Sequence, residues 1–484
     1  MTNLKEVSLS NLVFEARSRF HAPASEVFAW HEAKGAFDRL SPPWVDVQCV
    51  ERSGGIADGS RVVLLIKQGP VSIPWVLGHK DYIAGEQFCD YQIAGPFRFW
   101  QQLHKVRNLE TGGDFIADGA KDGTGELSEL LDRVEFCPPL GLPGKIGGAL
   151  YIKSELKRLF RYRHALLARD LALKDRYGDK PLKILISGAT GLVGRHLKAL
   201  LETQGHQVIT LARGASAGIV AGDDAILWDP SREEIARPLP EDLDAVVHLC
   251  GHNVAASRWT LQEKQLIFES RVKSTTYLAK LLAGLKKPPA AVVFASAVGF
   301  YGDRGVEPLT EDAACGSGFL AEVCRSWEQS GSLAEKSGAR VSYARIGAVL
   351  SPRGGALAKL LPVFQSGGGG PVGSGQQYFP WVALEDVSAA IYHAIQEPTL
   401  SGPFNLVSPE CVTNAQFSRS LGRVLHRPAL LPVQPALLKA LYGEMAEALM
   451  LASLRVLPQK LKQSGYQFQD PDLEPALKFM LGLA

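Results

Sequence analysis

The chain has 484 residues and a mass of 52.4 kDa, more than one hydrophobic core usually organises, so its length predicts two or three domains. Its 46% hydrophobic and 21% charged residues are typical of a globular protein and argue against a disordered chain or a coiled coil. Lys and Arg number 52 against 50 Asp and Glu, and the net charge of +2 lacks the basic excess of nucleic-acid-binding proteins. We expect a packed protein of enzyme size with no nucleic-acid partner.

The first ten residues include Lys5 and Glu6 and lack the apolar run of a secretory signal. The longest uncharged stretch, 360–384, is interrupted by a glycine tract and two glutamines, which does not suit a membrane-spanning helix. Seven scattered cysteines, never spaced as Cys-x-x-Cys, favour neither a disulfide framework nor a zinc cluster. These patterns predict a cytoplasmic protein with reduced thiols, no membrane span and no metal site.

The first third of the chain reads as an antiparallel sheet with a long helix. Apolar residues alternate with charged ones over Phe14–Phe20, which predicts a half-buried strand, and Pro23 marks the start of a helix. Glycine-rich turns separate later strands such as 61–67 and 101–106. Over Leu150–Tyr177 apolar residues recur at helical spacing, so we expect a long helix that covers the sheet. Its other face is basic, which can attract an anionic ligand but is more simply a solvated helix face; these residues are Lys153, Lys157, Arg158, Arg161, Arg163 and Arg169.

By the stretches 14–44 and 123–139, this part resembles the START-like SRPBCC/polyketide cyclase superfamily. The resemblance implies an α+β helix-grip fold, a curved antiparallel sheet wrapped around a long helix and an apolar cavity. Such a cavity suits a lipid-like or aromatic ligand. Alternatively, the large aromatic residues of this part simply pack a core; they are Trp75, Phe97, Phe99 and Trp100.

A linker is expected at 178–181, where consecutive strands give way to alternating strands and helices. The sequence therefore predicts a START-like ligand-binding domain over 1–177 and a Rossmann-type α/β domain with a doubly wound parallel sheet over 182–431. Residues 432–484 are expected to form a small helical C-terminal domain packed on the second.

A glycine-rich turn stands directly after the β-rich run 182–187 and before a helical stretch, 195–204. In the pattern Gly-x-x-Gly-x-x-Gly, Gly188 permits a tight bend, Gly191 lets backbone N–H groups approach a pyrophosphate, and Gly194 lets the helix pack against the strand. This strand–turn–helix context predicts a dinucleotide site. Its expected contacts within the turn are Gly188, Thr190, Gly191, Leu192, Val193 and Gly194.

The next strand, 207–211, should end beside the adenosine ribose, and it is followed by Arg213 instead of an acidic residue. Because a guanidinium matches a 2′-phosphate in charge and donor geometry, we expect NADP(H) to be favoured over NAD(H). The alternative is that Arg213 points into solvent. Asp229 either binds the adenine amino group or caps the turn at Pro230.

A buried strand is also predicted over 244–250, and Gly251 follows where the chain must pass close to the cofactor. We therefore expect cofactor contacts from Leu249, Cys250 and Gly251, and from Ala295 on a later strand. A metal site formed by His248, Cys250 and His252 is not expected, because residues that alternate along a strand point to opposite faces.

Several further motifs accompany the turn: DAVVHLCGHNV from Asp244, VVFASAVGFYG from Val292, FLAEVCRSWE from Phe319, RIGAVLSPRGGAL from Arg345 and NLVSPECVTN from Asn405. With SGATGLVG from Ser187, they resemble the epimerase-like branch of the extended short-chain dehydrogenase/reductase superfamily, the type named nucleoside-diphosphate-sugar epimerase. The resemblance runs from about Leu182 to the C-terminus. It implies a dinucleotide-binding sheet with a smaller substrate-capping part.

The proton-transferring pair of that superfamily is not where the resemblance places it. A tyrosine and a lysine four residues on normally share one helical face, but Leu320 and Cys324 occupy those positions if Glu328 marks the glutamate that often follows. Ser296 and Tyr301 are the local hydroxyls that we nominate for catalysis, as hydrogen-bond donor and acid. Tyr301 can equally pack against the cofactor or the substrate loop.

Polar residues expected near the carboxyl edge of the sheet are candidates for substrate binding: Asn253, Arg258, Arg271 and Arg345. Arginines there can hold a phosphate or a carboxylate, or they can form structural ion pairs with acids such as Glu269 or Asp386.

The resulting hypothesis is an NADP(H)-dependent hydride transfer on a small or apolar carbonyl or alcohol substrate, with an apolar ligand captured by the first domain. The alternative is a catalytically silent NADP(H)-binding protein with a sensing or regulatory role. A third possibility is a cyclase-type enzyme that acts from the first domain alone.

Overall fold

The computed structural model describes residues 11–69, 71–110, 126–138, 148–214 and 224–484. The chain separates into two units, Met1–Gly178 and Asp179–Ala484. Among the described helices, none combines the length and the apolar character needed to cross a membrane.

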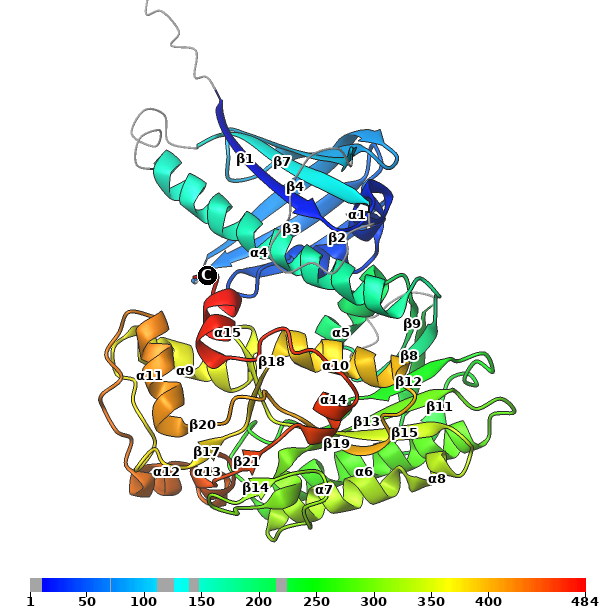
Figure 1. Ribbon diagram of the computed structural model, residues 1–484, viewed down its shortest axis with the longest axis vertical. Coiled ribbons are helices and arrows are strands. Elements are labelled where there is room, and N and C mark those ends of the chain that lie inside the picture. The colour runs from blue at the N-terminus through cyan, green and yellow to red at the C-terminus, as the bar shows by residue number, and fades with distance from the viewer. Residues whose placement is uncertain (1–10, 70, 111–125, 139–147, 215–223) are drawn as a thin grey trace, which may run out of the picture. The chain divides into compact units, whose positions relative to one another are not determined.

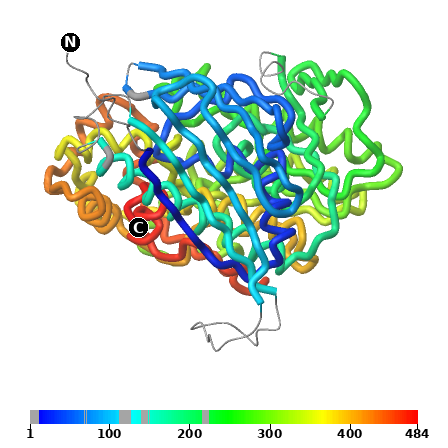
Figure 2. Tube along the Cα trace, turned by 90° about the horizontal axis from the view of Figure 1, so that it is seen from above, coloured from blue at the N-terminus to red at the C-terminus, as the bar shows by residue number. Residues whose placement is uncertain are grey.

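The first unit is built on a seven-stranded antiparallel sheet in the order β1-β7-β6-β5-β4-β3-β2, and Figure 2 shows these strands side by side in blue and cyan. In the first strand Phe14, Ala16 and Ser18 are half-buried while Glu15 and Arg17 are exposed, as the alternating pattern predicts. The strands are β1 (Leu12–Phe20), β2 (Asp46–Ser53), β3 (Arg61–Gln68), β4 (Val71–Ile83), β5 (Gln87–Ala94), β6 (Phe99–Leu109) and β7 (Leu127–Cys137).

The described residues of this unit include the helices α1 (Ala24–Glu32), α2 (Ala36–Leu40) and the long α4 (Ala149–Tyr177). The helix predicted over Leu150–Tyr177 is thus confirmed, and it packs against β1, α1 and α2 (Figure 1). Trp75, Phe97 and Trp100 contact one another with ring centroids 4.7–5.7 Å apart, which is the core packing that the sequence left as an alternative for these three residues. Phe99, the fourth residue of that alternative, is 37% exposed and does not belong to the core.

The second unit contains an eight-stranded sheet in the order β11-β10-β9-β8-β12-β13-β15-β19. All neighbours from β10 to β19 are parallel, and only β11 is antiparallel to its neighbour. The first strand of the second unit is β8. The strands β9 and β10 follow on one side of it, and β12, β13, β15 and β19 follow on the other side. This order confirms the predicted doubly wound Rossmann-type fold, whose switch point lies between β8 and β12. The strands are β8 (Lys183–Ser187), β9 (Gln207–Ala212), β10 (Ala225–Asp229), β11 (Glu234–Ile235), β12 (Ala245–His248), β13 (Ala291–Ala297), β15 (Arg340–Ile346) and β19 (Gly402–Leu406).

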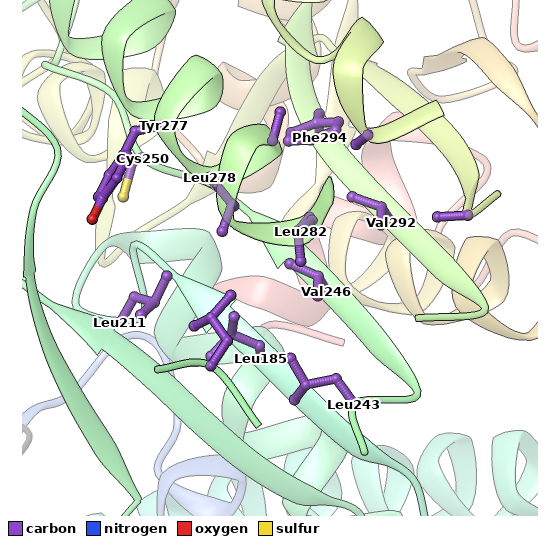
Figure 3. Close-up of a cluster of buried hydrophobic side chains, with 14 of the residues drawn as sticks. Leu185, Leu211, Leu243, Val246, Cys250, Tyr277, Leu278, Leu282, Val292 and Phe294 are labelled. Carbon is purple, nitrogen blue, oxygen red and sulfur yellow. The ribbon is translucent and has the colours of Figure 1, made fainter. Parts of the chain in front are cut away.

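Helices cover both faces of this sheet. α5 (Leu192–Thr203) packs with α10 (Leu384–Gln396) on one face, and α6 (Leu261–Ala283) packs with α7 (Phe319–Ser330) and α8 (Ser332–Glu335) on the other (Figure 1). The strands are nearly continuous apolar runs because both faces are covered. Figure 3 shows Leu185, Val246 and Val292 from three neighbouring strands beside Leu278 and Leu282 of α6.

The remaining elements of the second unit follow the strands of the sheet or belong to the C-terminal segment. They are η3 (Val298–Tyr301), β14 (Pro308–Leu309), β16 (Ala348–Ser351), α9 (Gly355–Gln365), β17 (Tyr378–Phe379), β18 (Trp381–Ala383), β20 (Val412–Thr413), α11 (Asn414–Val424), α12 (Pro435–Tyr442), α13 (Glu444–Ala446), η4 (Glu447–Leu451), β21 (Arg455–Val456), α14 (Gln459–Gln463) and α15 (Leu473–Met480). The segment predicted to be helical, 432–484, thus carries four α-helices in this region. Its status as a separate domain stays a prediction.

Candidate functional site

The glycine turn joins β8 to α5 at the switch point of the sheet. Gly188 has a φ of 78°, and a Cβ atom there would lie 2.9 Å from the carbonyl carbon and oxygen of Leu249, which follows β12. Any side chain at this position would therefore push the two strand ends apart. The first glycine of the motif is required both by its backbone conformation and by the space available.

The third glycine is required by packing alone. A Cβ on Gly194 would collide with the carbonyl oxygen of Gly188 and would lie 2.8 Å from Cα of Ala189. The middle residue, Gly191, is the N-cap of α5 and donates its N–H to Gly188 at 3.0 Å. The first N–H groups of a helix have no partner within the helix, so those at the start of α5 are available to donate to an anion. These residues fit a dinucleotide pyrophosphate.

Beneath the turn, His248 is buried between two serines. Its Nδ1 lies 2.6 Å from Oγ of Ser187 and its Nε2 lies 3.1 Å from Oγ of Ser274. Burial, with a smaller contribution from the charge of Arg213, lowers the pKa of His248 to about 3. His252 instead contacts Glu263, 2.7 Å away. Among the described residues, no three His, Cys, Asp or Glu side chains are arranged to hold a metal ion.

The two residues expected near the adenosine lie at the ends of β9 and β10. Arg213 is exposed directly after β9, and its charge reaches both His248 and Cys250 at the switch point. Asp229 accepts hydrogen bonds from the N–H of Ser231 at 2.9 Å and from its hydroxyl. This geometry is the turn-capping role that the sequence allowed for Asp229.

The positions of the missing tyrosine–lysine pair lie against η3, which directly follows β13. A Cβ on Gly299 would lie 3.1 Å from Cβ of Leu320 and 3.8 Å from Sγ of Cys324. Cys324 is 3% exposed, and burial raises the pKa of its thiol to about 12. An apolar side chain and a protonated thiol therefore occupy the helix face where the superfamily places its proton donor.

Ser296 and Tyr301 are joined through one buried polar network. Ser296 donates to Oε1 of Glu328 at 2.7 Å, and Glu328 forms two hydrogen bonds with Arg345. Arg345 also donates to the hydroxyl of Tyr301 at 2.9 Å, and that hydroxyl donates to Oδ1 of Asn405 at 2.7 Å. The structure thus brings together Ser296, Tyr301 and Arg345, and it adds Asn405, which the sequence analysis had not selected although it lies in one of the quoted motifs.

Both nominated hydroxyls are engaged inside the protein. Tyr301 is 0% exposed and Ser296 is 2% exposed, and burial raises the pKa of Tyr301. Arg345 is likewise 3% exposed. Its charge is balanced by Glu328, so it is an ion-pair partner within the fold and in this conformation does not present its guanidinium to a substrate.

The other three candidates lie on or near the loop after β12. Arg271 donates to the carbonyl oxygens of His252 and Ile267 at 2.9 and 3.0 Å, and its guanidinium would contact a Cβ on Gly251. Arg258 lies beside Gly443, and Asn253 accepts from the N–H of Ala255 in a local turn.

The alternative that these arginines form structural ion pairs holds for Arg345, but the acid is neither Glu269 nor Asp386. Glu269 pairs with Lys273 on the next turn of α6, and Asp386 accepts hydrogen bonds from Tyr466, Gln469 and Asp470. Arg345 forms its ion pair with Glu328, a residue of α7 that is close to Arg345 only in the folded protein.

Comparison with known proteins agrees with this geometry. Residues 184–406 match the NAD dependent epimerase/dehydratase family. An epimerase family protein of Mycobacterium bovis, Mb2239, is 39% identical over 296 residues, which are 61% of this chain and 96% of that protein. The chain belongs to the NAD-dependent epimerase/dehydratase family. A further match to a domain of unknown function, DUF1731, covers residues 435–480 of this epimerase-family chain.

Two solved structures resemble this member of the epimerase family. A nucleoside-diphosphate sugar epimerase from Corynebacterium glutamicum aligns with a TM-score of 0.76 at 32% identity and covers 97% of this chain and 90% of its own. The human epimerase family protein SDR39U1, solved with NADPH, aligns with a TM-score of 0.58 at 32% identity and covers 62% of this chain and 99% of its own. The likeness to the Corynebacterium protein therefore extends into the first unit.

Proposed function

We propose that the second unit binds NADP(H) at the glycine turn and transfers a hydride between its nicotinamide and a small or apolar carbonyl or alcohol substrate. The observation that carries this proposal is the turn at the switch point, where neither Gly188 nor Gly194 can accept a side chain and where α5 begins. Bound NADPH would supply the hydride. The chain's own residues hold the diphosphate by backbone N–H groups, and the absence of Cβ atoms at Gly188 and Gly194 lets the turn pack closely against Leu249 and against the start of α5.

Selection of the phosphorylated cofactor is assigned to Arg213. It is exposed at the end of β9, where the ribose of a dinucleotide lies in this fold, and the position carries no acid that would repel a 2′-phosphate. The human relative SDR39U1, whose structure was solved with NADPH, supports the same choice.

Proton transfer must follow an atypical route in this proposal. Leu320 and Cys324 cannot serve as the usual pair, and the hydroxyls of Ser296 and Tyr301 reach the substrate only if their network opens. We assign the proton to water or to one of these two hydroxyls after such a rearrangement.

A second candidate function is a catalytically silent NADP(H)-binding protein. The observation that favours it is the engagement of both hydroxyls: Tyr301 is held by the buried Asn405 and Arg345, and Ser296 by the half-buried Glu328. In this case occupancy by the cofactor would bias a conformation or a partner surface without turnover.

The deciding experiment measures cofactor binding and turnover on the same full-length protein. Calorimetric titration with NADPH and NADH tests the site itself, and panels of carbonyl compounds with NADPH and of alcohols with NADP⁺ test turnover. Heat without turnover in either direction supports the silent protein, and no heat with any of these nucleotides contradicts both functions.

Ser296→Ala and Tyr301→Phe separate the two candidates further. If either variant keeps its affinity for NADPH but loses biological function, catalysis is supported. If both variants keep their affinity for NADPH and their biological function, the network is structural and neither hydroxyl transfers the proton.

For the first unit, the START-like resemblance and the capture of an apolar ligand remain proposals. The antiparallel sheet and the long α4 support them. Native mass spectrometry of the full-length protein should detect a co-purified apolar molecule, and organic extraction that recovers none contradicts the proposed capture. A cyclase-type activity of this unit would require turnover that persists without any pyridine nucleotide.

A further inference from the structure

A chain of polar side chains crosses the sheet of the first unit, in the direction perpendicular to its strands. At its centre, Oδ1 of Asp132 on β7 lies 2.6 Å from Nδ1 of His104 on β6. His104 approaches Asp90 on β5 at 3.5 Å, and Asp90 lies 3.1 Å from Nε2 of His79 on β4. Asp132, His104 and His79 are each less than 9% exposed. Buried polar groups of this density need a structural or functional reason.

The other end of the chain reaches α4 and β1. Nε2 of His164 on α4 lies 2.7 Å from Oδ2 of Asp132, and its Nδ1 lies 2.8 Å from Oγ of Ser18 on β1. Ser18, His164 and Asp132 thus form a hydrogen-bonded series of hydroxyl, imidazole and carboxylate. A nucleophile beside a base that a third group orients is the geometry of activated serines on several unrelated folds.

Ser18 and His164 line a groove of about 630 Å³ that runs between β1 and α4, the two elements seen side by side in Figure 1. The groove combines an apolar lining with positive charge. Its apolar residues are Phe14, Ala16, Phe20, Phe160, Ala165 and Ala168. Two cations of α4, Lys157 and Arg161, lie on the helix face that carries Phe160 and His164. Arg17 and Arg19 alternate with Ser18 along β1 and point to the other face of the sheet, where Arg17 pairs with Glu15. This lining suits an acyl chain that carries an anionic group.

The charge on His104, which contacts Asp132 on the side opposite His164, favours the series of Ser18, His164 and Asp132. Burial alone would lower the pKa of His104, but Asp132 and Asp90 outweigh it and raise that pKa to about 9. A protonated His104 therefore gives Asp132 its cationic partner. Asp132 uses its other oxygen, Oδ2, to contact Nε2 of His164.

We propose that the groove between β1 and α4 is an acyl-transfer site that hydrolyses carboxylic esters bearing an apolar acyl chain and an anionic group. Ser18 is the nucleophile, His164 the general base, and Asp132 a positioning residue that holds His164. This activity is separate from the nucleotide site of the second unit.

The reaction balances with water as the only co-reactant. Oγ of Ser18 bonds to the ester carbonyl carbon while its proton moves to Nδ1 of His164. The bond from the carbonyl carbon to the alcohol oxygen then breaks, and that oxygen takes the proton from Nδ1. Water repeats the sequence on the acyl-Ser18 ester, which releases the carboxylic acid and restores the hydroxyl. No group is oxidised or reduced.

A fluorophosphonate probe tests the nucleophile directly on the full-length protein. We expect covalent labelling that peptide mass spectrometry places on Ser18, and Ser18→Ala should abolish it. The matched control is Ser53→Ala, which removes an exposed hydroxyl from β2 of the same unit and should leave labelling unchanged. Absence of labelling, or labelling at another serine that persists in Ser18→Ala, overturns the proposal.

Ester turnover tests the base and the positioning residue. With p-nitrophenyl esters, His164→Gln should lower kcat by about 100-fold or more, as expected for loss of a general base. Asp132→Asn should lower kcat with little change in KM, because Asp132 does not line the groove. Melting temperatures identify variants that fail to fold. If a variant does not fold, the proposal is tested by the site of fluorophosphonate labelling in the unaltered protein. An unchanged kcat in a folded His164→Gln variant contradicts the assignment.

The specificity of the groove gives an independent measurement. We expect a higher kcat/KM for p-nitrophenyl esters whose acyl chain ends in a carboxylate than for neutral esters of equal length. The difference should shrink as salt is added, because the charges at an open groove are screened. Equal values for the two series at low salt would contradict an anionic substrate.

Discussion

The guanidinium of Arg345 forms two hydrogen bonds with the carboxylate of Glu328, from Nε to Oε1 and from Nη2 to Oε2, each 2.9 Å long. The pair joins β15 to α7, and the two side chains are 4% and 13% exposed. The same guanidinium lies 3.5 Å from the ring centroid of Phe300. Geometry of this kind makes the pair a structural bond between the sheet and the helix that flanks the expected catalytic position.

Glu328→Gln should lower the free energy of unfolding by about 3 kcal/mol, because it leaves the buried charge of Arg345 without its counter-charge. Urea denaturation measures the change. The control is Glu307→Gln, which breaks the more exposed pair of Glu307 with Arg304 and should cost less than about 1 kcal/mol. Similar losses in the two variants would show that burial does not strengthen the pair.

Gly194→Ala should weaken NADPH binding by about 10-fold or more, since the added methyl group displaces the carbonyl of Gly188 and opens the turn. Calorimetric titration gives the affinity. Gly284→Ala is the matched control at the end of α6, where a Cβ meets no atom closer than 3.5 Å. If the two variants bind NADPH equally well, the turn does not hold the diphosphate.

Arg213→Ala should reduce the affinity for NADPH by about 10-fold while the affinity for NADH stays the same, because only the 2′-phosphate loses a partner. Titration with both nucleotides provides the comparison. Arg232→Ala, which removes an exposed guanidinium after β10, should change neither affinity. A parallel loss for both nucleotides in Arg213→Ala would assign this arginine to the fold and not to the phosphate.

The buried imidazole of His248 makes stability depend on pH. Its pKa is about 3 in the folded protein against the usual 6.5, so below pH 6.5 the unfolded chain binds a proton that the folded protein does not. The stabilising contribution is complete above pH 6.5 and is lost as the pH falls towards 3. Between pH 6.5 and 5 we expect His248 to lower the free energy of unfolding by about 2 kcal/mol.

His248→Gln tests this dependence, since glutamine can keep hydrogen bonds to Ser187 and Ser274 but cannot take up the proton. Denaturation at a series of pH values should show a shallower loss of stability below pH 6.5 in the variant. Identical slopes would mean that His248 takes up a proton as readily in the folded protein as in the unfolded chain, and that its pKa is not lowered.

Much of the second unit could be predicted from short stretches of sequence. A strand, three glycines at fixed spacing and a helix are local features, and they indicated both the parallel fold and the position of Gly188, Gly191 and Gly194. The direct contact of Gly188 with Leu249 could be expected only in outline, because it depends on the order in which β8 and β12 pair.

The polar networks depend on the tertiary structure. Glu328 was recognised only as a marker in α7, and its bond to Arg345 explains why the arginine that the sequence offered to a substrate is turned inward. Ser18 and His164 are 146 residues apart, and Asp132 stands on a third element. Residue type and spacing cannot bring such groups together.

The glycine turn and the alternation of strands and helices could be predicted from the amino-acid sequence, because both arise from backbone conformation and periodicity within a few residues. The burial of charges, the engagement of hydroxyls and the grouping of side chains in one groove depend on the tertiary structure. Those properties arise when distant segments pack together and exclude water, and then each buried polar group must find its partner wherever the fold places one.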